Sequence, residues 1–588
     1  MRFKELRKPM PHLQQAILLL LVTLLTLCAT AQAEPLPERT ALDDYVHKPD
    51  DSYEWKVVFD ETSLGLRTVV LHMISQTWRT PEEVNRPQWE HFLSIHIPEK
   101  LDSTIGGLVI GNGKYAHGLN QFLLQSASGA SVLARQTNTV CASLSTVPNQ
   151  PLTFYEEGTV VNPLLTRPEQ ERVEDDLVAY TWDKYLKTGD PTWPAFNPMV
   201  KSAVRAMDAV TEFMASEEGG EIKIDRFVLT GASKRGWTTW LTAAVDDRVV
   251  GIAPLVIDVL NARASMLHHF ESYGFWASPI KDYVHHQIMA RMAEPRLQEL
   301  YELIDPYYYR DRLEIPKLVM NATGDQFFLP DSSQFYWDDL KGDKYLRYVP
   351  NTDHGLGDSD ALESLICFYF LMTHNQQIPN IDWEVQEDGS LVLTPSIQPE
   401  EVRLWQANNP TGRDFRLGRI GPAYTSSVIE SDADGKYVGR GDIEQSGWTA
   451  YFLEATFDLG RNHLGQKLTH KLTTQVKVMP DKEPFKGKDP TQPNTYTLVF
   501  KHNGAGTVDV MHNILKRKIP GDKRNIRLLR KTLGEFGYIH IRAADDLEKA
   551  LDKGLSYLKS QGFKYVDYHI ESGEVPTFPP IHPSKKAK

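Results

Sequence analysis

The chain has 588 residues, of which 41% are hydrophobic, so it is long enough for about two to four domains with sizeable cores. Its formal net charge of −13 excludes a general affinity for nucleic acid or for anionic membranes. The composition is that of an ordinary globular protein, without low-complexity or repeated segments.

The first 33 residues have the pattern of a secretory signal peptide. Basic residues between positions 2 and 8 precede an apolar run at 16–27, and Ala31 and Ala33 are the small residues that a cleavage site after position 33 requires. The apolar run is short for a membrane anchor. We therefore expect an exported chain, periplasmic or secreted, that keeps no membrane span after cleavage.

Two cysteines, Cys141 and Cys367, follow the predicted cleavage site. A disulfide is possible in an oxidising compartment. Both cysteines lie in apolar segments, however, and this favours two buried free thiols.

Residues 34–377 are expected to form one α/β domain, in which strand-like and helical patterns alternate from residue 66 onward. The strand candidates are two runs within 66–98, followed by 106–113, 139–147, 226–229, 249–258, 316–325 and 344–356. This alternation predicts a mostly parallel α/β sheet. In such sheets the functional residues lie just past the carboxyl ends of the strands.

A long insert, at about 259–316, interrupts this alternation and is expected to cap the site. Its many aromatic residues either line a pocket or form the core of the cap itself. The insert also holds two histidine pairs, at 268–269 and 285–286. Adjacent histidines on a helix point apart and no carboxylate lies at a ligand spacing, so we predict neither a metal site nor a cofactor.

After residue 377 the pattern changes to a period of two. Residues 378–485 are punctuated by turn residues, which predicts a small antiparallel β-sandwich. A linker rich in proline, lysine and aspartate follows, and residues 495–575 are expected to form a small α/β module. The sequence therefore predicts that a chain ending near residue 488 still folds and keeps its activity.

The stretch LTGASKRGWTTW, at 229–240, contains a candidate nucleophile. A strand runs into small residues and Ser233, and a helix-compatible run begins at Gly236. The usual signature of such a turn, G-x-S-x-G, has its second glycine two residues after the serine. Here Arg235 occupies that position and the glycine comes one residue later.

A serine nucleophile needs a base, and the base needs an orienting carboxylate. In α/β-hydrolases the three follow in the order serine, acid, histidine. Asp325 and His354 end the last two predicted strands, in that order. Asp258 is the second candidate for the acid. Three further aspartates are expected to be helix caps or solvated loop carboxylates: Asp331, Asp353 and Asp358.

Several long motifs, among them GASKRGWTTW at 231–240 and VPNTDHGL at 349–356, resemble the PhoPQ-activated pathogenicity-related protein family. The resemblance covers roughly residues 40–485 and excludes the last hundred. It implies an α/β-hydrolase fold with Ser233, Asp325 and His354 as the catalytic triad. The family name records regulation and virulence and does not record a reaction.

The turn at Ser233 also resembles that of glucuronoyl esterases, in which a basic residue follows the serine. We expect the backbone N–H of Lys234 to serve the oxyanion hole, together with that of Asn112 or Gly113 in the glycine loop. Basic residues at a helix N-terminus oppose the helix dipole. Lys234 and Arg235 therefore indicate either an anionic substrate or a structural carboxylate.

These observations together predict an exported serine hydrolase of the esterase or peptidase type. Its partner is an acyl or peptide substrate that the sequence does not identify. The alternative is a secreted signalling or binding protein on a catalytically silent hydrolase scaffold.

Overall fold

The computed structural model describes residues 39–115, 129–155, 171–410, 412–443, 446–491, 495–501, 526–533, 536–542 and 568–572. The predicted signal peptide, 1–33, lies outside these residues. The described residues from Arg39 onward belong to one compact unit.

A nine-stranded sheet forms the centre of the fold, in the order β1-β2-β3-β5-β4-β6-β7-β8-β9. Strands β1, β2, β3 and β5 pair antiparallel, whereas β5, β4 and β6 to β9 pair parallel. The strands are β1 Glu54–Ser63, β2 Leu66–Thr77, β3 Gln88–Pro98, β4 Ile105–Ile110, β5 Cys141–Leu144, β6 Arg226–Ala232, β7 Val249–Leu255, β8 Lys317–Ala322 and β9 Lys344–Val349. The predicted α/β-hydrolase-like sheet is therefore confirmed.

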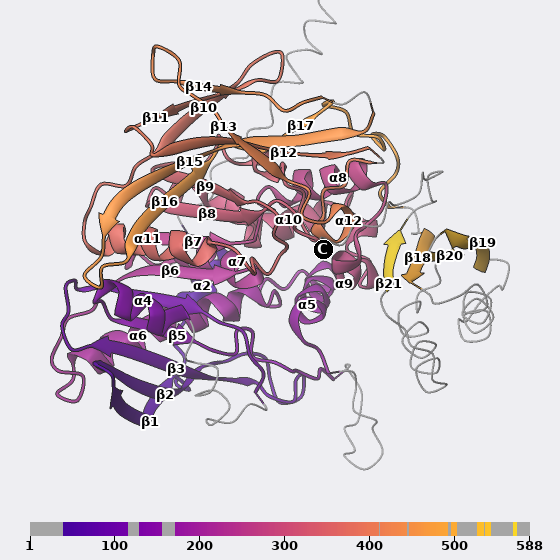
Figure 1. Ribbon diagram of the computed structural model, residues 1–588. Coiled ribbons are helices and arrows are strands. Elements are labelled where there is room, and N and C mark those ends of the chain that lie inside the picture. Colours follow the sequence, from indigo (N-terminus) through magenta and orange to yellow (C-terminus); the bar gives the residue numbers. More distant parts are fainter. Residues whose placement is uncertain are drawn as a thin grey trace, which may run out of the picture. The chain divides into compact units, whose positions relative to one another are not determined.

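Helices cover both faces of the parallel part of this sheet (Figure 1). Helices α6 and α7 contact one face, with α2 against them, whereas α4 and α11 contact the other face. Their bounds are α2 Ala41–His47, α4 Gly129–Thr137, α5 Glu174–Thr188, α6 Phe196–Ala215, α7 Lys234–Val245 and α11 Ala361–Thr373. Strand β8 is buried at every residue and shows no alternation of polar and apolar positions, as expected of a strand that is covered on both faces.

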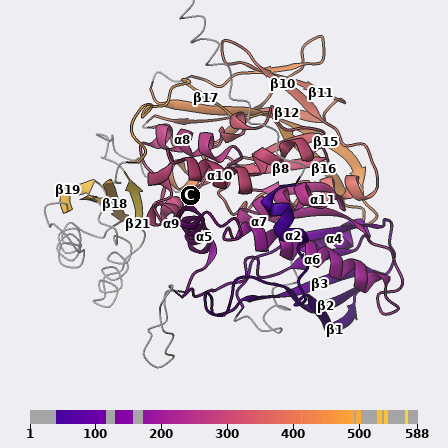
Figure 2. The ribbon, with the colours of Figure 1, turned by 180° about the vertical axis from the view of Figure 1, so that it is seen from behind.

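The predicted cap insert consists of short helices. They are α8 Ala262–Tyr273, η1 Ser278–Ile280, α9 Lys281–His285, η2 Met289–Arg291, α10 Pro295–Ile304 and η3 Pro306–Arg312. Helices α9 and α10 contact α5 (Figure 2). The helix η3 contacts α7. Tyr273, Trp276 and Tyr309 are buried, as expected of aromatic residues that pack in a core.

Residues 381–479 form two antiparallel sheets. One has the order β10-β11-β14, and the other has the order β13-β12-β15-β16, with β17 also paired to β15. The elements are β10 Ile381–Val385, β11 Leu391–Pro395, β12 Glu401–Asn409, α12 Leu417–Ile420, β13 Thr425–Val428, β14 Tyr437–Gly439, β15 Trp448–Arg461, β16 Lys467–Thr473 and β17 Lys477–Met479. Two antiparallel sheets are what the period-two pattern predicts.

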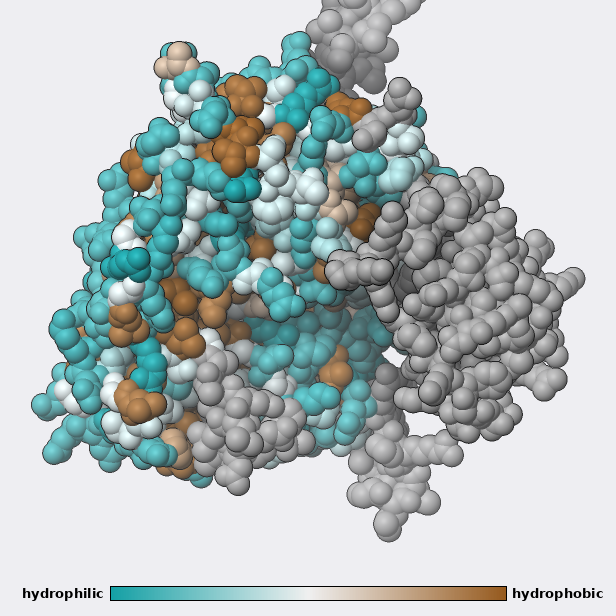
Figure 3. Space-filling model, in the orientation of Figure 1, coloured by the Kyte–Doolittle hydropathy of each residue, from teal (hydrophilic) through white to brown (hydrophobic). Residues whose placement is uncertain are grey.

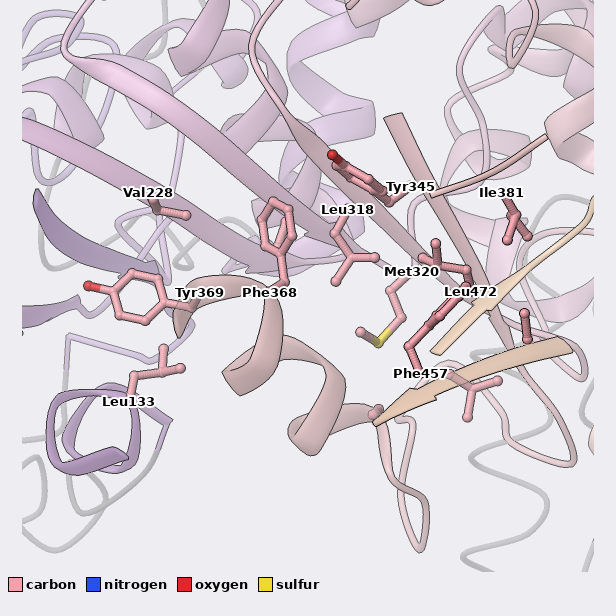
Figure 4. Packing of buried hydrophobic residues seen from close by; sticks show 14 of the residues in the cluster. Leu133, Val228, Leu318, Met320, Tyr345, Phe368, Tyr369, Ile381, Phe457 and Leu472 are labelled. Atoms are coloured by element: carbon pink, nitrogen blue, oxygen red, sulfur yellow. The ribbon is translucent and has the colours of Figure 1, made fainter. Parts of the chain in front are cut away.

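One hydrophobic cluster connects the α/β sheet to the antiparallel sheets. Figure 4 shows Leu318 of β8 and Phe368 of α11 in the same cluster as Phe457 of β15 and Leu472 of β16. Strand β16 contacts both α11 and β9. The antiparallel sheets therefore share their core with the central sheet. Without them, α11 would expose its apolar side.

Among the described residues no helix is long and apolar enough to cross a membrane. In the view of Figure 3, hydrophobic residues form small separate groups on a surface where hydrophilic residues predominate. Val428 and Val438, on the antiparallel sheets, are each about half exposed. Isolated exposed residues of this kind are ordinary on a protein surface.

The strands of the predicted C-terminal module pair antiparallel in the order β19-β20-β18-β21. They are β18 Thr495–Lys501, β19 Ile526–Leu533, β20 Phe536–Arg542 and β21 Tyr568–Ser572. Residues 545–562, whose sequence has a helical pattern, lie outside the described residues.

The linker before this module is bonded to the cap insert. Glu483 lies 2.6 Å from His268 Nδ1, the Phe485 N–H donates to the Glu271 carbonyl, and the Trp276 indole donates to the Pro490 carbonyl.

We therefore expect a chain ending at Thr491, which keeps all three contacts, to melt within about 3 °C of the full chain. A chain ending at Asp481 should melt several degrees lower in a thermal shift assay. Insolubility of the chain that ends at Thr491 would show that the C-terminal module belongs to the main core.

Candidate active site

Ser233 occupies the sharp turn between β6 and α7. Its backbone angles are φ 58° and ψ −128°, in a region that residues with a side chain seldom adopt. The Ser233 N–H donates to the Leu255 carbonyl of β7 at 2.8 Å, and the Ser233 carbonyl accepts from Trp237 at 3.0 Å. These bonds hold the strained turn, in the geometry expected of a nucleophile elbow.

The displaced glycine of the motif has a structural explanation. A Cβ on Gly236 would lie 2.9 Å from the Gly231 carbonyl oxygen and 3.1 Å from that of Leu255. A Cβ on Gly231 would lie 2.6 Å from the Arg235 carbonyl oxygen. Gly231 and Gly236 therefore let α7 approach β6 and β7 closely, and the Arg235 position is released from that requirement.

Asp325 and His354 lie together past the ends of β8 and β9. His354 Nδ1 is 2.7 Å from Asp325 Oδ2. Asp325 Oδ1 accepts from the N–H groups of Phe327 and Phe328, at 2.7 and 3.4 Å. Because the carboxylate accepts at Nδ1, His354 is held as the tautomer whose Nε2 is free to accept a proton.

The other ring nitrogen of this histidine is buried. Among the described residues, His354 Nε2 has no hydrogen-bond partner, and no hydrogen bond joins it to Ser233. The Phe327 ring lies against the imidazole, with ring centroids 4.4 Å apart. The structure therefore brings the predicted acid and base together and contains no hydrogen bond between the base and the predicted nucleophile. Such bonds are often long before substrate binds.

Asp258, the second candidate for the acid, has different partners. The Tyr336 and Tyr348 hydroxyls each lie 2.6 Å from one of its carboxyl oxygens. Burial raises the pKa of Asp258 from 3.8 to about 8, in spite of these two hydrogen bonds. The carboxyl group is therefore mostly neutral at pH 7, when one tyrosine accepts its proton and the other donates to it.

We expect Asp258→Asn to gain stability relative to the wild type as the pH rises from 5 to 8. The unfolded carboxyl ionises near 3.8 and the folded one near 8, so the wild type loses up to about 1.4 kcal/mol per pH unit between these values. The amide does not titrate and replaces the neutral acid in shape. Urea unfolding at several pH values measures the difference, which should level off above pH 8. A difference that is constant from pH 5 to 8 would mean that Asp258 is ionised throughout.

The prediction that Asp331 is a cap or a solvated carboxylate is wrong. Asp331 is buried, with Oδ2 at 2.5 Å from Arg413 Nη2 and Oδ1 at 3.0 Å from His268 Nε2. Although burial opposes ionisation, these two cations hold the pKa of Asp331 well below its usual range. Its partners come from the cap insert and from the segment after β12, so their approach depends on tertiary folding. The carboxylate of Asp353, in contrast, accepts from the Gly355 N–H in an exposed loop, as predicted.

The three expected oxyanion donors lie on two segments. Lys234 is the first residue of α7, so its N–H has no partner within the helix. Asn112 and Gly113 follow β4, where the Asn112 carbonyl accepts from the Thr146 N–H at 3.0 Å. Neither the Asn112 N–H nor the Gly113 N–H donates to a described carbonyl. Among the described residues, none of the three N–H groups therefore has a backbone hydrogen-bond partner, as an oxyanion donor requires.

The side chains of Lys234 and Arg235 are paired with carboxylates. Lys234 Nζ lies 2.9 Å from Glu174 and 3.2 Å from Asp175, and Arg235 Nη2 lies 2.7 Å from Glu174. Of the two alternatives from the sequence, a structural carboxylate therefore accounts for the basic pair. Sequence reasoning missed Glu174, because the acidic run at 174–176 shows that carboxylates are present but does not indicate their partners.

The histidines of the cap insert have other partners. His286 Nε2 lies 2.8 Å from Asp176, and His269 Nε2 accepts from the Ala277 N–H at 3.0 Å. Among the described residues no group of histidine, cysteine and carboxylate side chains is arranged to hold a metal ion. Cys141 and Cys367 are buried free thiols, and burial raises their pKa values to about 11 and about 12.

Comparison with known proteins decides the family. The model of the PhoPQ-activated pathogenicity-related proteins matches residues 42–416. The chain belongs to this family. Autocrine proliferation repressor protein A of Dictyostelium discoideum is 35% identical over 500 residues, which are 79% of this chain and 94% of that protein.

Among solved structures, acetyl xylan esterase 1 from Thermoanaerobacterium sp. JW/SL YS485 is 14% identical, with a TM-score of 0.37 over 58% of this chain and 95% of the esterase. A glucuronoyl esterase from Solibacter usitatus is 13% identical, with a TM-score of 0.32 over 55% of this chain and 86% of the esterase. The fold is assigned from the strand order of the central sheet.

The match to the PhoPQ-activated pathogenicity-related family includes Ser233, Asp325 and His354. It ends at Arg416, inside the antiparallel sheets, whereas the motifs in the sequence led us to expect a resemblance as far as about residue 485. The family model therefore covers the central sheet and the cap insert.

Proposed function

We propose that the chain is a serine hydrolase that cleaves an ester or amide bond. The observation that carries this proposal is the 2.7 Å contact between His354 Nδ1 and Asp325, which leaves Nε2 buried and without a hydrogen-bond partner among the described residues. Ser233 occupies a strained turn at the end of a strand of the same parallel sheet. A positioned base and a serine held in such a turn are what acyl transfer requires.

In the proposed reaction Ser233 Oγ attacks the acyl carbon and gives its proton to His354 Nε2. The N–H groups of Lys234 and of Asn112 or Gly113 bind the oxyanion of the tetrahedral intermediate. The imidazolium then protonates the leaving alcohol or amine, and an acyl-serine remains. A water molecule then attacks the acyl carbon and gives a proton to His354, which passes it to the departing Ser233 Oγ, so that the acid is released and the serine is restored. Asp325 keeps the imidazole tautomer and stabilises its protonated form.

A panel of acyl substrates tests this proposal. We expect the full chain to hydrolyse an activated ester such as p-nitrophenyl acetate with saturation kinetics, and an aromatic phosphonate to abolish that activity. A methyl uronate ester, an acetylated oligosaccharide and a peptide anilide then separate esterase from peptidase activity. Folded protein that turns over none of these substrates would contradict the proposal.

Export belongs to the proposal as well, and the signal pattern at positions 1–33 supports it. We expect the N-terminus of the protein from the exporting cell to begin at Glu34. Protein that retains its first 33 residues and stays in the cytoplasm would contradict export.

A second candidate function is that of a secreted signal on a silent scaffold. The 35% identical relative is named an autocrine proliferation repressor, and this name favours the candidate. Under this alternative, any effect of the added protein on cell proliferation is equal for the wild type and Ser233→Ala. An effect that is lost in the variant would indicate that hydrolysis produces it.

A further inference from the structure

Glu174 is the first residue of α5, and its side chain joins several groups near Ser233. Its Oε1 accepts from Arg235 Nη2 at 2.7 Å and from Gln150 Nε2 at 2.6 Å. Its Oε2 lies 2.9 Å from Lys234 Nζ. Although burial opposes ionisation, the Arg235 hydrogen bond and the two positive charges lower the pKa of Glu174 to about 2. Glu174 is therefore a carboxylate throughout the neutral pH range.

The partners of Glu174 extend this network to both sides of the site. Gln150 Nε2 also donates to the Gly113 carbonyl at 3.0 Å, and Arg235 Nε donates to the Val147 carbonyl at 2.6 Å. One carboxylate thus connects the segment after Ser233 with the glycine loop after β4. These are the two segments that carry the proposed oxyanion donors.

The backbone of Glu174 is strained in a way that the network explains. Its φ is 51°, which is unfavourable for a residue with a Cβ. The Glu174 N–H donates to Gln150 Oε1 at 2.7 Å, so backbone and side chain are both bonded to the same glutamine. Strain of this kind persists where surrounding contacts determine the conformation, and it is often found at functional sites.

We propose that Glu174 is a positioning residue, which sets the distance between the Lys234 and Gly113 sides of the oxyanion hole. This inference rests on the proposed hydrolase function. Lys234 and Arg235 are each only 7% exposed and follow each other in sequence, so without the carboxylate their charges repel. Asp175, at 3.2 Å from Lys234, compensates only one of them. The helix start and the glycine loop then separate.

The test compares Glu174→Gln with the matched control Asp175→Asn, using p-nitrophenyl acetate. Active sites are counted by the end point of fluorophosphonate labelling, so that kcat is expressed per competent site. We expect Glu174→Gln to lower kcat by about tenfold to a hundredfold and to change KM by less than about threefold. Asp175→Asn should change both by less than about threefold.

The affinity for a trifluoromethyl ketone distinguishes a positioning role from a purely structural one, because the ketone adduct places an oxyanion in the oxyanion hole. Its affinity should fall by the same factor as kcat/KM in Glu174→Gln. If that variant is insoluble, Gln150→Met breaks the link to Gly113, leaves the Glu174 ion pairs in place and should act in the same direction. Unchanged kcat per competent site, or unchanged ketone affinity, overturns the role of Glu174. A wild type without turnover or labelling overturns this role together with the proposed function.

Discussion

Replacing Ser233 by alanine is expected to lower kcat for the best ester substrate by about 10⁶-fold, because no other group can form the acyl-enzyme. The fold should survive, since alanine can keep the backbone bonds that Ser233 makes to Leu255 and Trp237. Steady-state kinetics together with a thermal melt measures both effects.

The histidine supplies the control for this experiment. His354→Ala alone should lower kcat by about as much as Ser233→Ala does. The double variant should lower kcat no further than either single variant, because nucleophile and base act as one unit. Costs that add up, or a Ser233→Ala variant with more than about a tenth of wild-type kcat, would show that the two residues do not act together.

The second large effect is expected for Asp325→Asn, with kcat lowered by about 10⁴-fold. An asparagine amide facing His354 Nδ1 can present its N–H₂ group, which stabilises the tautomer that carries its proton on Nε2. That tautomer cannot accept the proton of Ser233. The measurement is kcat at pH 7 with the same ester, and circular dichroism establishes that the variant is folded.

Asp258→Asn is the matched control for this variant, because Asp258 is equally buried and follows the neighbouring strand. Its carboxyl group contacts two tyrosines and makes no contact with His354. We expect its kcat to stay within about threefold of the wild type. Equal losses from the two variants would contradict the assignment of Asp325 as the orienting acid.

The central sheet and the meeting of Asp325 with His354 could be predicted because both follow from local patterns. Alternating strands and helices give a parallel sheet, and the carboxyl ends of its strands meet at one edge. Positions at those ends are therefore brought near one another, whatever the packing of side chains elsewhere.

The ion pairs could not be predicted in the same way. Glu174 lies 61 positions from Arg235 and Asp331 lies 82 positions from Arg413, so neither pairing has a local signal. Likewise, the alternation in β16 predicts a strand with one buried face, but it does not say that α11 covers that face. These contacts depend on how separate elements pack together.

The position of a fluorophosphonate adduct, located by mass spectrometry of the full chain after digestion, tests directly whether Ser233 is an activated nucleophile. We predict one adduct, on Ser233, that forms in the wild type, forms much more slowly in Asp325→Asn, and is absent from Ser233→Ala. An adduct on another serine, or none on folded wild-type protein, would contradict the assignment of Ser233 as an activated nucleophile.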